Sequence, residues 1–414
     1  MMPSTLLRAF DALRTPALLE SISDSNLVFA VDNKATAFAS GASMLHMPRK
    51  PVLTTVTAMN GCIGVRAIEA LHMLARCTAP AQSGTRLFPW YRHWGVLRYL
   101  DYFALASGQR KLLKMNSEVI KDVVGNQRRV VSEELGIAFG ALLAMRWAEG
   151  GNGSVPTYIV DIDVALTNGL PKGVRPVNLN KVSTLRPDYL IIRDEAGTVD
   201  IKVAECKGSK SKSQAIAQLA RATYQLAGVR VSGSQPSSLA VATVVTDDNL
   251  FCYLLDPPED HMVFEPAQDS DTEIASRSRI SEMNEEAAQE TQSSCCLDIL
   301  REDLVALAIR ASRFGLAAYV GQPFDDSPQI EFTPYGKARG SHVTVGTGSG
   351  WSAVVGFLLD EEVHSALKSP SSDDLVAAQR TFAEKLQKPK VDAQGATAYS
   401  AMTDGSILSI KFGE

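Results

Sequence analysis

The stretch RPDYLIIRDEAGTVDIKVAECKGSKSK, residues 186–212, decides how the fold is interpreted. Two runs rich in Ile, Leu and Val flank a short polar turn, a pattern that predicts a β-hairpin. Each run also carries charge at the end far from the turn: Asp188 begins the first run, and Glu205 and Lys207 end the second. Charges among buried apolar residues are tolerated only when they are paired, hydrogen-bonded or bound to a metal. The hairpin therefore indicates a site as well as a fold.

The length of the turn decides how these charges meet. Side chains alternate along a strand, so Glu205 and Lys207 share one face of the second strand. A four-residue loop at 194–197 places Asp188 opposite Val203, and a two-residue loop places it opposite Glu205. Either even-numbered loop brings all three charges to the apolar face, whereas an odd-numbered loop separates the two carboxylates. Because register follows the buried apolar pattern, we expect an even-numbered loop.

Two carboxylates this close cannot both stay ionised unless a cation lies between them or a proton is taken up. Oxygen ligands at this spacing suit Mg²⁺ or Mn²⁺. Such an ion polarises a phosphoryl oxygen and activates water, while the neighbouring ammonium of Lys207 orients the water or stabilises developing negative charge. The pattern thus predicts phosphodiester hydrolysis. The simpler interpretation is a solvated surface pair of Glu205 and Lys207, worth at most about 1 kcal/mol. Asp200 and Lys202 repeat the acid-x-Lys pattern on the other face near the turn, and there we expect such a solvated pair.

Pro187-Asp188 followed by Glu205-Cys206-Lys207 resembles the PD-(D/E)xK nuclease superfamily, which has the restriction-endonuclease-like fold. The resemblance covers about residues 130–256 and includes the order helix, strand, hairpin, helix, strand. It implies an α/β fold with an αβββαβ mixed sheet flanked by helices. It also implies that Asp188, Glu205 and the backbone carbonyl of Cys206 bind the metal, and that Lys207 assists the attacking water.

The two flanking helices supply further candidates. VVSEELGIAFGALLAMRWAEG (130–150) has an apolar stripe at helical spacing, with Ser132 as a candidate cap inside its start and Gly150 beyond its end. The family often adds an acid from this helix, and Glu134 is preferred over Glu133 because it borders the apolar stripe. Between the two helices, VPTYIVDIDVAL (155–166) alternates like a strand. Around the second helix, four polar residues are expected to contact nucleic acid: Lys210, Lys212, Gln218 and Arg221.

Length and composition limit the class of protein. At 414 residues the chain exceeds one ordinary core, and 45% apolar with 21% charged residues is typical of a globular protein. We expect a mainly helical domain at 1–128, the nuclease core at 129–256, an acidic flexible linker at 257–297 and an α+β domain at 298–414. With no long apolar run and no secretory signal, a cytoplasmic protein is expected, not a membrane protein.

The sequence therefore predicts a Mg²⁺- or Mn²⁺-dependent nuclease that cleaves DNA, with RNA as the other candidate substrate. The family resemblance alone suggests a role in bacterial defence against foreign DNA, since a fold does not fix a function. The alternative is a non-cleaving subunit of a larger complex, which binds nucleic acid or protein on the same fold. An ATPase or other protein partner and a homo-oligomeric state both stay open.

Overall fold

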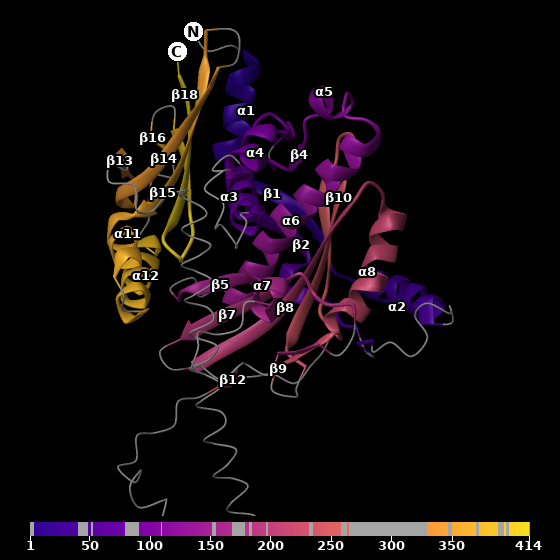
Figure 1. Cartoon of the computed structure of the whole chain (residues 1–414). Helices are drawn as coiled ribbons and strands as arrows, with labels where there is room; N and C mark the ends of the chain where they lie inside the picture. Colours follow the sequence, from indigo (N-terminus) through magenta and orange to yellow (C-terminus); the bar gives the residue numbers. More distant parts are fainter. Residues whose placement is uncertain are drawn as a thin grey trace, which may run out of the picture.

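The computed structural model of the chain forms a mixed α/β protein whose two larger sheets and their helices are stacked in layers (Figure 1). The residues that it describes are 4–39, 49–50, 53–78, 91–108, 110–150, 155–167, 179–181, 184–195, 198–231, 235–257, 263–264, 329–346, 350–369, 372–387, 393–394 and 397–413.

The larger sheet is mixed and contains the predicted hairpin. Its strands lie in the order β2 (Gly61–Val65), β1 (Ala17–Ile22), β11 (Leu250–Leu255), β10 (Ser237–Val245), β8 (Thr198–Ser209), β7 (Tyr189–Glu195) and β5 (Thr157–Asp161). The short strand β12 (Val263–Phe264) pairs with the start of β8. β8 is parallel to β10 and antiparallel to β7, so both kinds of pairing meet on this one strand.

Helices cover both faces of this sheet (Figure 1). One face packs on α6 (Gly125–Glu149), with α3 (Ala67–Thr78) behind it. The other packs on α8 (Lys212–Leu226), against which α2 (Ser25–Ala39) lies. In β8, Ala204 and Cys206 belong to the core on the α6 side, and Ile201 and Val203 to the core on the α8 side. The predicted order of helix, strand, hairpin, helix and strand is present as α6, β5, β7–β8, α8 and β10.

Helix α6 lies directly against the end of β8. It starts at Gly125, so Ser132 is a buried residue inside the helix and not its cap; its hydroxyl donates to the Arg129 carbonyl at 2.8 Å. The predicted end is confirmed, since Gly150 adopts the left-handed conformation at φ 56°. A Cβ on Gly208 would overlap the carbonyl of Ser132, so only glycine allows the helix backbone to approach β8 this closely.

The predicted strand at 155–166 is shorter than expected. β5 ends at Asp161 and the chain turns at once into α7 (Ile162–Thr167). An Asp161 carboxylate oxygen accepts a hydrogen bond from the Asp163 backbone N–H at 2.8 Å, which satisfies a donor in the first turn of the helix. This local side-chain hydrogen bond overrides the alternating pattern. A small separate sheet pairs β6 (Leu179–Lys181) with β9 (Val229–Val231).

The first 128 residues join the larger sheet. β1 pairs in parallel with β11 and antiparallel with β2, so the sheet continues across the boundary expected at residue 128. The rest of this stretch adds α1 (Ser4–Arg14), the 3₁₀ helix η1 (Thr57–Met59), α4 (Tyr91–Arg98), the paired strands β3 (Phe103–Leu105) and β4 (Leu113–Met115), and α5 (Ser117–Ile120).

The second sheet is antiparallel and packs on α1 and α3. Its order is β13 (Gln329–Thr333), β14 (Gly336–Gly346), β15 (Ser352–Asp360), β18 (Ser406–Gly413), β17 (Thr397–Ala401) and β16 (Ala393–Gln394). α11 (Glu361–Lys368) and α12 (Ser372–Leu386) lie on its outer side (Figure 1). On the inner side, the rings of Phe10 and Phe412 meet at 5.7 Å between centroids. The linker predicted at 257–297 lies outside the described residues, apart from Pro257 and β12.

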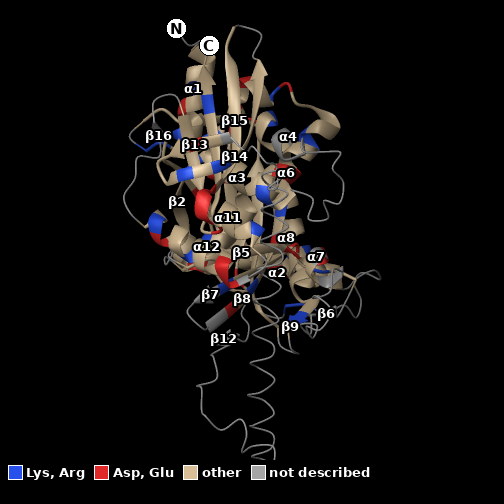
Figure 2. Cartoon of the chain, turned by 60° about the vertical axis from the view of Figure 1, so that its left-hand side comes forward, with Lys and Arg blue, Asp and Glu red and all other residues tan. Residues whose placement is uncertain are grey.

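Charged residues of both signs are spread over the whole ribbon (Figure 2). With a net charge of −5, the chain as a whole does not attract polyanions. Contact with nucleic acid would therefore have to come from a local group of cations. Within the described part of the chain, every helix is too short or too polar to cross a lipid bilayer.

Candidate active site

The observed register of the β7–β8 hairpin brings the predicted carboxylates together. Tyr189 pairs with Ala204 and Glu195 with Thr198, which leaves two residues between the strands. Continuing this register places Asp188 opposite Glu205. The two-residue loop is therefore confirmed and the four-residue loop is wrong. A loop of either length would bury the same apolar face. The two-residue loop is the one observed, and it adds more residue pairs to the β7–β8 ladder than the four-residue loop would.

The two carboxylates and the amine converge on the face covered by α8. The Lys207 ammonium lies against Glu205 Oε1 and 3.8 Å from Asp188 Oδ2, so both acids contact the same amine. Leu190 and Val203, at neighbouring positions of the same face, are completely buried. The charges thus lie at one end of an apolar surface, as the sequence predicted.

Pro187 and Asp188 together end the β7–β8 ladder. In the observed register Pro187 falls opposite Cys206, and proline has no N–H with which to continue the pairing. The Cys206 N–H instead donates to Asp188 Oδ2 at 2.9 Å. Since the N–H and C=O of one residue point to the same side of a strand, the Cys206 carbonyl faces this open edge too. Pro187 therefore leaves that carbonyl available as an oxygen ligand, and the hydrogen bond fixes the Asp188 carboxylate beside it.

Burial makes the charges of this site costly. The Glu205 side chain is 0% exposed, and burial, with the Asp188 carboxylate second, raises the pKa of Glu205 to about 8 against the opposing effect of Lys207. Burial also raises the pKa of Asp188. The pKa of Lys207 rises because the two carboxylates outweigh its own burial. Neither Glu205 oxygen receives a hydrogen bond of ordinary geometry from the described residues, although the Lys207 ammonium lies against Oε1.

These groups fit a hard divalent cation. The buried Glu205 carboxylate, the Asp188 carboxylate and the Cys206 carbonyl form the kind of oxygen donor set that Mg²⁺ or Mn²⁺ prefers. The Cys206 side chain is not part of this set, because it lies on the opposite face under Gly140 and burial raises its thiol pKa. Within the described ranges no three His, Cys, Asp or Glu side chains converge, so the protein would supply two carboxylates and the Cys206 carbonyl, and water the remaining ligands.

Glu134 is bound elsewhere. Both of its carboxylate oxygens accept from Arg98, at 3.2 and 3.1 Å, and one also accepts from the Tyr99 hydroxyl at 2.5 Å. Glu133 is exposed and lines the hollow beside Gly208. The preference for Glu134 over Glu133 is therefore not supported, because the partners that hold Glu134 come from α4 and the residue after it. Only the fold reveals them.

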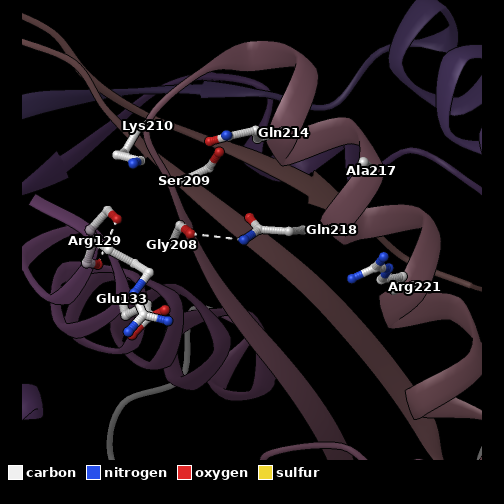
Figure 3. Close-up of a pocket in the computed structure, with 10 residues that line it drawn as sticks. Arg129, Glu133, Gly208, Ser209, Lys210, Gln214, Ala217, Gln218 and Arg221 are labelled. Atoms are coloured by element: carbon white, nitrogen blue, oxygen red, sulfur yellow. Dashed lines mark hydrogen bonds between the residues drawn. The ribbon is translucent and has the colours of Figure 1, made fainter. Parts of the chain in front are cut away.

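Three of the four residues predicted to bind nucleic acid line one pocket. It has a volume of ≈ 340 Å³ and lies between α6 and α8 at the end of β8, where Gly208 and Ser209 line it (Figure 3). Lys210, Gln218 and Arg221 line it. Lys212 does not, and its ammonium lies 5.5 Å from the centre of the Phe251 ring. Arg129 of α6 also lines the pocket but was not predicted, because this helix was expected to start after it. The adjacent cations Arg128 and Arg129, one turn before Glu133, are the sequence feature that could have indicated it.

The second acid-x-Lys pair on β8 differs from the first. Asp200 and Lys202 pair at 3.2 Å, and their side chains are only 20% and 12% exposed, so the expected solvated pair is wrong. The Lys202 ammonium also lies 4.7 Å from the centre of the Trp147 ring of α6, which accounts for its burial. The pair nevertheless lies on the α6 side, away from Glu205, and offers a matched control on the same strand.

Comparisons of the chain with family models, with curated proteins and with solved structures found no match. The resemblance to the PD-(D/E)xK superfamily therefore rests on the motif and on the geometry of the hairpin.

Proposed function

We propose that this protein is a metal-dependent nuclease that hydrolyses phosphodiester bonds, with DNA favoured over RNA, on a restriction-endonuclease-like core. One observation carries the proposal: Asp188 and Glu205 meet on adjacent strands around the Lys207 ammonium, and Glu205 is a completely buried carboxylate. A carboxylate is retained in such a place only with a compensating charge or a function. The order of α6, β5, β7–β8, α8 and β10 supports the same proposal. The cytoplasmic location and the role in defence stay predictions.

Each residue has a distinct task in this proposal. The metal would be bound by Asp188, by Glu205 and by the Cys206 carbonyl. The Cys206 N–H fixes the orientation of Asp188, and the surrounding buried residues restrict Glu205. When bound, Mg²⁺ supplies positive charge that polarises the phosphate and favours ionisation of water. With the carboxylates neutralised, Lys207 Nζ is free to turn toward the phosphate. There it donates a hydrogen bond to the attacking water or to an oxygen on which negative charge develops.

Cleavage of labelled DNA and RNA by the full chain, with Mg²⁺ or with EDTA, tests this proposal. We expect cutting with Mg²⁺ only, and loss of ~100-fold or more in rate for Asp188→Asn, Glu205→Gln and Lys207→Met. Lys202→Met is the matched control, since it removes an ammonium from the other acid-x-Lys pair of the same strand. It should keep the rate of the wild type once corrected for folded fraction.

The outcomes separate the hypotheses. Equal cutting by the wild type and by the three site variants would show that the activity arises elsewhere. Binding of nucleic acid without cutting under any metal would favour the non-cleaving subunit. Faster cutting of RNA than of DNA would reassign the substrate and keep the mechanism.

A further inference from the structure

The edge of β8 stays open beyond the proposed metal site. Pairing with β7 stops at Ala204, whereas β8 continues to Ser209, and within the described part of the chain residues 205–209 pair only with β10 on the other side. The Gly208 carbonyl on the open edge accepts from Gln218 Nε2 at 3.0 Å. Gly208 and Ser209, at the end of this edge, line the pocket of ≈ 340 Å³ between α6 and α8, the helices that cover the two faces (Figure 3).

The pocket gathers cations that lack acidic partners. Arg129 comes from α6, Lys210 follows β8 and Arg221 comes from α8, and all three are exposed. None of them forms an ion pair within the described part of the chain. The Arg221 guanidinium lies 5.5 Å from the centre of the Phe38 ring, which holds it in place by a cation–π contact. Against these three charges the lining contributes one carboxylate, Glu133.

We propose that this pocket binds a backbone phosphate of the substrate strand, on a nucleotide close to the one that is cut. The inference rests on the proposed nuclease function and adds the path of the strand to it. Ser209 lies four residues beyond Glu205, about 13 Å along the strand at ~3.3 Å per residue. That separation is too long for one phosphate group to touch both places. The strand would follow the open edge of β8, with one phosphate at Asp188 and a neighbouring one between Arg129, Lys210 and Arg221.

The lining also indicates which part of the strand is bound. Among the described residues no aromatic side chain lines the pocket, so this part of the lining offers no stacking surface for bases. Its volume is at the lower end of the range for small-ligand sites, which fits one nucleotide unit and not a duplex. The pocket is therefore expected to bind a single strand through phosphate, with little dependence on base sequence and strong dependence on salt.

The experiment measures binding without cutting. The full chain is titrated with a short fluorescent single-stranded oligonucleotide in EDTA at several salt concentrations, in one DNA arm and one RNA arm. Arg129→Gln, Lys210→Gln and Arg221→Gln should each weaken binding severalfold and lower the slope of log K against log salt by about 0.7. Lys411→Gln is the matched control, because it removes an exposed cation of β18 in the second sheet, which lies outside the lining of the pocket.

If the three pocket variants have the same affinity and salt slope as Lys411→Gln, the inference is overturned. If the wild type cuts nucleic acid with Mg²⁺ while the pocket variants bind unchanged, the pocket proposal fails and the nuclease proposal stands. If the pocket variants lose binding while the wild type never cuts, the phosphate site stands and catalysis fails. A difference in affinity between the DNA and RNA oligonucleotides would show whether the pocket prefers a deoxyribose or a ribose strand. Thermal unfolding of each variant shows whether these exposed substitutions leave the fold intact.

Discussion

Replacing Glu205 by Gln should stabilise the metal-free protein at alkaline pH while it removes a proposed metal ligand. The pKa of Glu205 is raised from 4.5 to about 8, chiefly by burial and then by the Asp188 carboxylate. Between these two pH values the unfolded chain has lost the proton that the folded chain still holds, so folding stability falls as pH rises. The full cost above pH 8 is about 5 kcal/mol, at ~1.4 kcal/mol per pH unit. This figure already includes the favourable contact with Lys207, which lowers the pKa of Glu205.

The expected gain for Glu205→Gln is therefore about 5 kcal/mol at pH 9 and only about 1 kcal/mol at pH 5, where Glu205 is protonated in the folded protein. Urea unfolding of the full chain in EDTA at both pH values measures it. Added Mg²⁺ should stabilise the wild type at pH 9 but not the variant, because only a state that binds the ion gains from it. Asp200→Asn, the control on the other face of β8, should lose stability because it leaves Lys202 unpaired. A variant less stable than the wild type at pH 9 in EDTA would refute the reasoning.

Three further outcomes follow from the packing and the buried charges. Gly208→Ala should cost at least ~3 kcal/mol in urea unfolding, because its Cβ would overlap a carbonyl of α6, whereas Gly64→Ala, with open space at its Cβ, should stay within ~0.5 kcal/mol. Burial lowers the pKa of His72 to about 3, so the unfolded chain takes up a proton at this residue before the folded chain does as pH falls below ~6.5. About 2 kcal/mol of stability should therefore be lost by pH 5, and His72→Asn should reduce this dependence of stability on pH. Glu134→Gln should lower the melting temperature through lost hydrogen bonds worth ~1–2 kcal/mol, but Glu133→Gln should reduce the cleavage rate more.

The sequence was sufficient to bring the two carboxylates together, because the period of a strand is local information. Alternation alone places Glu205 and Lys207 on one face, and the apolar pattern selects an even loop that turns Asp188 the same way. It does not choose between two and four loop residues, since both keep the same face buried. That choice depends on how far the ladder extends toward Glu195 and Thr198, which the structure shows.

The supporting helix was harder to predict because its decisive contacts come from elsewhere in the chain. Helix α6 starts at Gly125, a turn or more before the polar residue expected to cap it, since packing on β8 and α3 stabilises its first turns. Glu133 and Glu134 are neighbours in sequence but point about 100° apart around a helix. Arg98, which holds Glu134, lies 36 residues earlier. A pattern along α6 carries no information about that partner.

Because β1 pairs in parallel with β11, the newly synthesised β1 must wait for a partner that is made much later. Glu20 meets Phe251, about 230 residues later, so this part of the sheet cannot close until most of the chain has been made. At ~5–20 residues per second, the wait is about 10–50 s. During that interval one edge of β1 has no partner, and unpaired edges are where other chains add on. Aggregation of nascent or truncated chains is therefore expected to begin at residues 17–22, and fragments that stop before β11 should be the most prone to it.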